Sequence, residues 1–279
     1  MNCLSILRAK DLLIRAIVHT DVGCVRQNNE DSARFYFLNG SRHHFIAVLA
    51  DGMGGYERGE DASALMVNTM CEDDSALMVN TACEDGCQED GNRLVGKNPT
   101  KWLRGLMAKA NNTIYEWSQQ QEAVMGTTCS ALLVWRKRVW CAHIGDSRIY
   151  MLLKGKLRQI TCDHTVVGEM MRNGGCTAAQ AAVHPQRSVL TKAIGTHPQI
   201  EPDIFKLKRR LRKGDRFLLC SDGLYDVVSD FEIAKLLSQK SIRNAAHDLV
   251  EAAKRNGGYD NITVLIVEIN KKGGNEHDA

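Results

Sequence analysis

Short apolar runs alternate with polar and glycine-containing segments along much of the chain. Runs of this length, bounded by turn-forming residues, are typical of buried strands. We therefore expect six strands, at residues 45–50, 129–135, 139–144, 148–153, 217–220 and 262–269.

A helical period appears between these runs. Five apolar residues spaced four and three apart predict one long amphipathic helix: Trp102, Leu106, Ala110, Ile114 and Trp117. A second helix begins near Ser229, where Ser229 and Glu232 have the spacing of a capping box. A third spans about 242–255 and ends at a pair of glycines. Strands with helices clustered between them favour the α+β class, with helices covering layered sheets in one domain.

One tandem repeat interrupts this pattern. Residues 61–72 and 73–84 are identical at ten of twelve positions. Two copies are too few for a solenoid, so a duplication is the simpler interpretation. In a straight helix, twelve residues rotate the second copy by roughly 120° relative to the first. We expect the first copy to form a helix docked on a sheet, and the second to form a surface extension or loop.

The charge and composition exclude several classes of protein. The 279 residues carry a net charge of +3, which is too small to favour nucleic acid or an anionic membrane as a partner. A basic run between residues 206 and 216 holds seven cations, Lys206, Lys208, Arg209, Arg210, Arg212, Lys213 and Arg216. This run is either a solvated edge before a strand or a docking patch for an acidic partner.

The ten cysteines are scattered through apolar segments, and the first residues lack the pattern of a signal peptide, so we expect no secretory leader. No apolar run approaches the ~20 residues that span a bilayer. Reduced thiols and a cytoplasmic location are the expectation.

Carboxylates follow or precede several of the predicted strands. Asp51, Asp146 and Asp222 follow strands, and Asp260 immediately precedes the last one. Glu30 and Asp31 are expected in a loop ahead of the first strand. A single aspartate after a strand is usually part of a turn. Several of them at converging strand ends would repel one another unless cations neutralise them.

The types of ligand indicate which cations these are. Oxygen ligands without nearby paired His or Cys favour Mg²⁺ or Mn²⁺ over zinc. Two such ions ~3.5–4 Å apart can share a bridging water and orient it for attack on a phosphate ester. Arg26, four residues before Glu30, is the candidate that grips the phosphate, and its alternative role is an exposed loop cation.

Six short blocks occur in an order that resembles the protein phosphatase 2C family, particularly its bacterial branch. They are RQNNEDS (26–32), ADGMGG (50–55), GTT (126–128), GDSR (145–148), CSDGL (220–224) and GGYDNITV (257–264). The resemblance covers about residues 15–270. It implies a four-layer α-β-β-α sandwich with two central antiparallel sheets flanked by helices. Residues 1–14 are then an N-terminal extension and 271–279 a polar tail.

The resemblance also implies a role for each matching residue. Asp51 would bridge two Mn²⁺ or Mg²⁺ ions, and the Gly52 carbonyl and Glu30 would serve the first ion. Asp222 and Asp260 would hold the second ion. Asp146, together with Asp222, would support a weaker third ion. Asp31 would orient water, Arg26 would bind the substrate phosphate, and Asn261 and Thr263 would support the Asp260 turn.

A mobile flap is implied between about residues 163 and 187, where five residues are candidates for shaping substrate choice: Met170, Met171, Asn173, Gly174 and Gly175. Many bacterial members have a histidine where this chain has Tyr56, and animal members have one where this chain has Met53. The resemblance therefore does not imply that a histidine protonates the leaving group in this chain. His143 is expected in a strand core, and His164 in a loop near the flap.

The implied function is a serine/threonine protein phosphatase, in which a water that bridges the two metals attacks phosphoserine or phosphothreonine directly. Its partners would be phosphoproteins, including a cognate kinase or its targets, with no nucleic acid and no membrane, and the protein would be a monomer. One alternative is a weak or inactive regulatory member of the same fold that binds phosphoproteins or a kinase. Another is a hydrolase of small phosphoesters.

Overall fold

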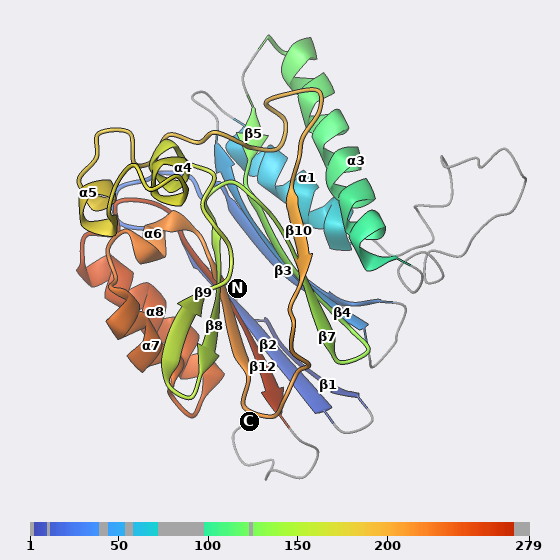
Figure 1. Cartoon of the computed structure of the whole chain (residues 1–279), viewed down its shortest axis with the longest axis vertical. Helices are drawn as coiled ribbons and strands as arrows, with labels where there is room; N and C mark the ends of the chain where they lie inside the picture. Colours follow the sequence, from blue (N-terminus) through green and yellow to red (C-terminus); the bar gives the residue numbers. More distant parts are fainter. Residues whose placement is uncertain are drawn as a thin grey trace, which may run out of the picture.

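The computed structural model describes residues 3–9, 12–38, 44–53, 58–71, 98–122 and 125–270. Two antiparallel sheets lie face to face (Figure 1). The first has the strand order β1-β2-β12-β11-β8-β9, with strands Cys3–Ala9, Leu12–Asp21, Ile262–Asn270, Arg216–Cys220, Arg148–Leu153 and Lys156–Gln159. The second has the order β10-β7-β6-β4-β3, with strands Asp203–Lys206, Arg138–Ile144, Cys129–Trp135, His44–Met53 and Asp31–Phe37. The short strand β5 (Gly126–Thr127) pairs with β4.

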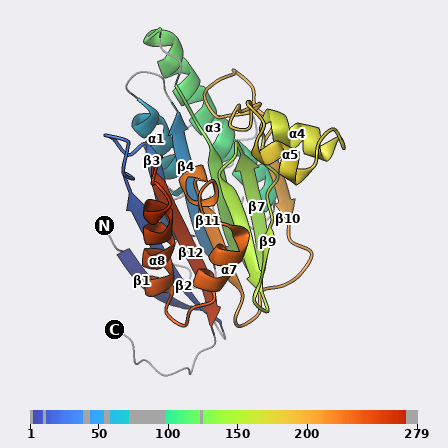
Figure 2. The same ribbon diagram turned by 90° about the vertical axis from the view of Figure 1, so that its left-hand side faces the viewer.

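Helices cover the outer face of each sheet (Figure 2). Helices α1 (Gly59–Cys71) and α3 (Pro99–Gln120) pack on the second sheet. Helices α6 (Asp222–Tyr225), α7 (Asp230–Leu237) and α8 (Ile242–Arg255) pack on the first. The short helices α4 (Val166–Arg172) and α5 (Ala178–Ala182) lie between β9 and β10 in the chain. The expected four-layer α-β-β-α sandwich is confirmed.

Strand β4 shows why its sequence fits the middle of this sandwich. Phe45 and Leu49 pack in the core between the two sheets, whereas Ile46 and Val48 pack against α1 and α3. Successive side chains of a strand point to opposite faces, so a strand with helices on one side and a sheet on the other is apolar throughout. This arrangement explains why the predicted strands are continuous apolar runs.

All six predicted strands are present, as β4, β6, β7, β8, β11 and β12. The sequence pattern missed β2 because Arg15 and His19 interrupt its apolar run. Arg15 is accommodated in the strand because its Nε donates to Glu268 Oε2 of the neighbouring β12 at 2.9 Å. Asp31 was also misplaced, since it begins β3 and does not lie in a loop. Residues 3–9, set apart as an extension, form β1 at the edge of the first sheet.

The predicted helices agree closely with the structure. The 102–117 pattern lies within α3, and Ser229 Oγ accepts from the Glu232 amide at the start of α7. Residues 61–71 of the first copy lie in α1, which packs on β3 and β4, whereas the rest of the repeat lies outside the described residues. No described helix is both long and apolar enough to cross a membrane. Seven of the cysteines in the described ranges are free.

Candidate metal and phosphate site

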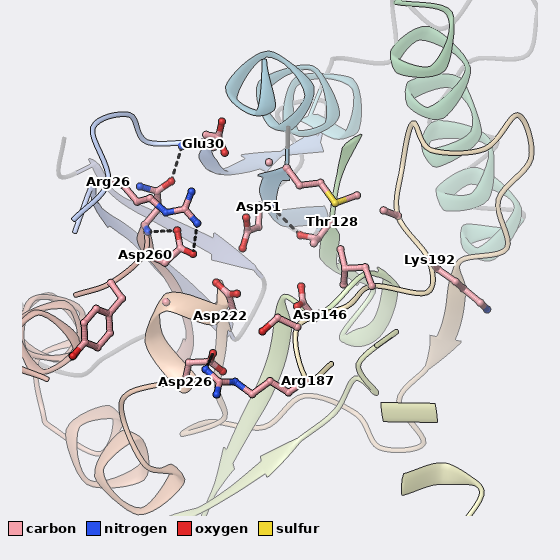
Figure 3. A pocket seen from close by; sticks show the side chains of 18 of the residues that line it. Arg26, Glu30, Asp51, Thr128, Asp146, Arg187, Lys192, Asp222, Asp226 and Asp260 are labelled. Carbon is pink, nitrogen blue, oxygen red and sulfur yellow. Dashed lines mark hydrogen bonds and ion pairs between the residues drawn. The ribbon is translucent and has the colours of Figure 1, made fainter. Parts of the chain in front are cut away.

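A cavity of about 930 Å³ lies at the ends of the central strands of both sheets (Figure 3). Its lining includes five of the six predicted carboxylates, namely Glu30, Asp51, Asp146, Asp222 and Asp260, together with Arg26 and Gly52. The sixth, Asp31, does not line the cavity and is the register partner of Asp51 on the neighbouring strand β3. The structure therefore brings together carboxylates from segments more than two hundred residues apart in the sequence.

Asp51 is held by two neighbouring strands. It lies directly opposite Asp31 in the β3–β4 register. On its other side the Asp51 amide donates to Thr128 Oγ1 at 3.0 Å, and the Thr128 amide donates to the Asp51 carbonyl at 2.8 Å. The next residue must be glycine, because a Cβ on Gly52 would lie 2.1 Å from the Gly59 carbonyl oxygen. The C-terminal end of β4 therefore packs closely against the start of α1.

Asp222 lies where the chain leaves β11 and enters helix α6. Ser221, the residue before it, donates from Oγ to Asp31 Oδ2 at 2.7 Å and accepts from the Thr263 amide at 3.0 Å. The hydroxyl thus links three strands at the base of the pocket. Ser221 was not singled out from the sequence, although its place directly before Asp222 was a usable signal.

Asn261 ties the Asp260 turn to the loop that carries Glu30. Its Oδ1 accepts from the Glu30 amide at 2.8 Å, and its Nδ2 donates to the carbonyls of Val22 and Asn28. The Asn261 amide donates to Asp260 Oδ1 at 2.9 Å. The expected supporting role of Asn261 agrees with these contacts.

Asp146 lies in the turn between β7 and β8, after Gly145 with a φ of +101°. The Gly145 amide donates to His164 Nδ1 at 3.1 Å, and the Gly145 carbonyl accepts from the His164 amide at 2.8 Å. Tyr225 Oη donates to the Asp146 carbonyl at 3.1 Å. His143 is fully buried in β7 and His164 is buried in the loop before α4, so both histidines lie where the sequence predicted.

Four carboxyls in or next to the cavity have raised pKa values. Burial, followed by the charges of Asp31 and Asp222, raises the pKa of Asp51 well above its usual range. Burial and the charge of Asp146 do the same for the pKa of Asp222. Burial also raises the pKa of Asp146 to about 7 and that of Asp31 to about 6. Burial and mutual repulsion disfavour the ionised forms of these carboxyls. Bound cations would be needed for all of them to be ionised together at neutral pH.

The donor set fits hard divalent cations. Asp31 Oδ1 is buried and has no hydrogen-bond partner within the described part of the chain, so a water held at a metal would satisfy it. Among the described residues, no three acidic, imidazole or thiol groups come close enough together to form a complete ligand set. Ions with several retained waters suit this spacing, and Mg²⁺ in particular retains several of its waters.

Two arginine side chains lie beside carboxylates of the cavity (Figure 3). Arg26 Nη2 donates to Asp260 Oδ2 at 2.8 Å. Arg187 lies 3.6 Å from Asp226 Oδ2, and Lys192 also lines the cavity. Asp226, Arg187 and Lys192 were not identified from the sequence. Asp226 lies one helical turn after Asp222, which was the available signal.

The segment predicted to form a flap, about residues 163–187, contains two short helices. Residues 166–172 and 178–182 form α4 and α5, and the bridge between Thr165 and Leu190 closes the base of the segment. The five residues named as candidates for substrate choice are not among the cavity-lining residues. Arg187, Ser188 and residues 190–193 line the cavity, as does Met53. Tyr56 lies outside the described residues.

Comparison with known proteins identifies the arrangement. The family described as Protein phosphatase 2C matches residues 24–261. The serine/threonine protein phosphatase PstP of Mycobacterium tuberculosis is 38% identical over 260 residues, which cover 92% of this chain and 45% of that protein. The chain thus spans less than half the length of this relative. The serine/threonine phosphatase stp of Listeria welshimeri is 34% identical over 260 residues, which cover 92% of this chain and 96% of that protein.

Solved structures agree with the sequence comparisons. The crystal structure of the Mycobacterium tuberculosis phosphatase PstP/Ppp has a TM-score of 0.77 at 36% identity, covering 92% of this chain and 99% of that one. A structure of the PstP catalytic domain in complex with two manganese ions has a TM-score of 0.73 at 34% identity, covering 93% and 99% of the two chains.

Proposed function

The chain belongs to the protein phosphatase 2C family of bacterial serine/threonine phosphatases, and we propose that it hydrolyses phosphoserine and phosphothreonine by direct attack of water. The observation that carries this proposal is the gathering of Asp51, Asp146 and Asp222 in one cavity with raised pKa values. Two Mn²⁺ or Mg²⁺ ions, when bound, would lower the pKa of a water and neutralise charge on the phosphate.

The family resemblance and the shared cavity support the following assignment of ligands. Glu30, Asp51 and the Gly52 carbonyl would hold one ion, and Asp51, Asp222 and Asp260 the other. Asp146, the group whose charge most affects the pKa of Asp222, would hold a weaker third ion with it. The homologous PstP domain with two manganese ions supports the choice of metal.

The remaining residues bind and orient. Asp31, with one buried carboxylate oxygen unpartnered in the described chain, would accept from a water and fix its orientation. Arg26 reaches the cavity beside Asp260 and would donate to the non-bridging phosphate oxygens. No nucleophilic side chain is required, so no phosphoenzyme is expected. Phosphoproteins, including a cognate kinase or its targets, would be the partners of the monomer.

The decisive experiment measures phosphate release from a phosphothreonine peptide with and without Mn²⁺. Three proteins would be compared: wild type, Asp222→Asn, and Glu116→Gln, a control on an exposed position of α3. Release should require Mn²⁺, fall at least a hundredfold in Asp222→Asn and remain unchanged in Glu116→Gln. Metal-loaded, folded wild-type protein without turnover would instead favour the regulatory alternative.

A further inference from the structure

Ten cations gather at the end of the sandwich opposite the cavity. They lie in the β6–β7 turn, the β8–β9 turn and the segment from the end of β10 to β11, and we call them the basal patch: Arg136, Lys137, Arg138, Lys154, Lys156, Lys206, Lys208, Arg210, Arg212 and Lys213. The segment after β10 runs along the lower ends of the strands in Figure 1. Residues 136–138, 154–156 and 206–213, which hold these ten cations, contain no Asp or Glu, and Asp215, just before β11, is buried and pairs with Arg209.

Two contacts make the patch continuous, one between backbone groups and one between side chains. The Leu211 amide donates to the Lys137 carbonyl at 3.0 Å, which joins the segment after β10 to the β6–β7 turn. Arg209 Nη1 lies 3.9 Å from Met151 Sδ, which joins the same segment to β8. The cations of three separate segments therefore share one face.

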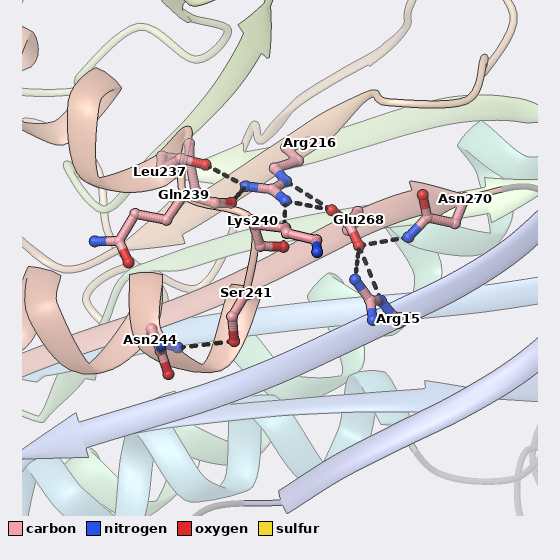
Figure 4. Close-up of polar contacts among 9 residues, drawn as sticks. All are labelled: Arg15, Arg216, Leu237, Gln239, Lys240, Ser241, Asn244, Glu268 and Asn270. Atoms are coloured by element: carbon pink, nitrogen blue, oxygen red, sulfur yellow. Dashed lines mark hydrogen bonds and ion pairs between the residues drawn. The ribbon is translucent and has the colours of Figure 1, made fainter. Parts of the chain in front are cut away.

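The solvated-edge interpretation accounts for only part of this pattern. Leu207 and Leu211 pack into the core between the sheets, whereas the residues at 208, 210 and 212 are exposed to solvent. Arg209 and Arg216, which belong to the same basic run, are used internally. Arg209 pairs with Asp215, and Arg216 donates to Glu268 and to main-chain carbonyls at the end of α7 (Figure 4).

Alternation does not explain why the outward residues all carry one sign of charge. Lys208, Arg210, Arg212 and Lys213 form no ion pair within the described chain, and their side chains are exposed. Removing the ten patch cations from a net charge of +3 leaves a net charge of −7 for the other residues. A single-sign concentration of this kind is costly for folding, and it attracts a polyanion.

We propose that the basal patch docks an acidic segment of the phosphoprotein substrate. This inference rests on the proposed phosphatase function, because the docked segment belongs to the molecule whose phosphate occupies the cavity. An acidic protein segment fits better than a bilayer, since none of the large exposed apolar residues of the described chain lies in the patch to insert into lipid. It also fits better than a nucleic acid, since Trp140, the aromatic residue beside Lys206, is buried and offers no stacking surface.

The fold sets the spacing between the two substrate contacts. Strands β6 and β7 run from the cavity to the patch and have seven residues each. At ~3.3 Å per residue they separate the two sites by roughly 20 Å. A substrate therefore needs at least about six extended residues between its phosphoresidue and its acidic segment, and more to follow the surface.

The test compares two phosphothreonine peptides, one with a neutral twelve-residue spacer leading to six glutamates and one with six glutamines in their place. The patch variant is Lys208→Gln with Arg210→Gln and Arg212→Gln. The control variant removes three exposed cations elsewhere, as Lys235→Gln with Arg243→Gln and Arg255→Gln. Both variants avoid Arg209 and Arg216, whose internal contacts support the fold.

For wild type at low salt, we expect the acidic peptide to have a KM about tenfold below that of the neutral one, with the same kcat. The patch variant should lose this advantage, the control should keep it, and about 0.5 M salt should abolish it. Equal KM values for the two peptides in wild type, or the same loss in both variants, would overturn the proposal. So would patch-dependent binding to phosphatidylglycerol vesicles or to single-stranded RNA without any difference in KM.

Two further readouts separate this proposal from the phosphatase function. Hydrolysis of p-nitrophenyl phosphate, which cannot reach the patch, should be equal in all three proteins, and its absence in every protein would contradict the phosphatase function. Fluorescence anisotropy of the labelled glutamate peptide measures docking without turnover, and it should weaken only in the patch variant.

Discussion

Arg26 and Asp260 form an ion pair at the mouth of the cavity, with Nη2 and Oδ2 2.8 Å apart across 234 residues of sequence. The pair places the candidate phosphate-binding group beside a candidate metal ligand. Both side chains are partly exposed, so their contact contributes little to stability. The contact matters because it holds the Arg26 guanidinium at the cavity.

Replacement of Arg26 should therefore affect substrate capture more than metal binding. Arg26→Ala is expected to lower kcat/KM for a phosphopeptide about 10- to 100-fold, mainly through KM, because a bidentate contact with phosphate is lost. Arg26→Lys should fall between wild type and alanine, since lysine keeps the charge without the fork geometry. Steady-state kinetics alongside Mn²⁺ titration calorimetry measures both effects. Unchanged kinetics in Arg26→Ala would show that the assignment is wrong.

The pocket carboxyls predict an unusual pH dependence for metal-free protein. Asp31 and Asp146, with pKa values of about 6 and about 7, keep protons in the folded state that the unfolded chain has already released. Stability contributed by these groups is therefore present at low pH and is lost as the pH rises from about 4 to about 7. Each unit of difference in pKa corresponds to about 1.4 kcal/mol.

Thermal unfolding of chelator-treated protein across this pH range tests the prediction. The increase in Tm on adding Mn²⁺ should be larger at pH 7 than at pH 5. Asp31→Asn, which removes one titrating group and keeps the size of the side chain, should flatten the metal-free profile. A gain from Mn²⁺ that is independent of pH would argue against metal binding by these carboxylates.

His164 is expected to position the Asp146 turn through its side chain. Because burial lowers the pKa of His164, the ring is neutral at pH 7, and Nδ1 can accept from the Gly145 amide. His164→Ala leaves that buried amide without its acceptor and should cost about 1–3 kcal/mol of stability. His164→Asn places an oxygen near the same position and should recover part of the loss. Urea unfolding of the three proteins would reveal the difference, and equal losses in both variants would exclude the hydrogen bond as the cause.

Gly223 offers a test of the packing behind Asp222. A Cβ at this position would lie 2.1 Å from the Asn261 carbonyl oxygen. Because this oxygen belongs to the main chain, the clash can be relieved only by moving one of the two segments that carry Asp222 and Asp260. Gly223→Ala should therefore weaken Mn²⁺ binding and lower Tm together. Gly105→Ala, on α3 with no atom within 4 Å of the added Cβ, is the matched control and should be neutral or slightly stabilising.

Particular residues show where prediction from sequence succeeds and fails. The strands buried between a helix layer and the other sheet, such as β4 and β12, are apolar throughout and easily predicted. Strand β3, half-buried at the edge of its sheet, alternates too weakly to be identified. For the site, Asp51, Asp222 and Asp260 were found because each adjoins an apolar run. Asp226 was missed although it lies one helical turn after Asp222, and Arg187 was missed because nothing in its own neighbourhood indicates the cavity.

The sequence alone determined the fold class, the six core strands and the set of acidic residues, because burial and strand-end chemistry leave local patterns in composition and order. Only the tertiary structure decided the pairing of Asp31 with Asp51, the Ser221 link between three strands and the ion pair of Arg26 with Asp260. It also decided which cations of the 206–216 run are internal and which face solvent. These relationships depend on strand register and on contacts between distant segments, and neither is encoded in any single stretch of the chain.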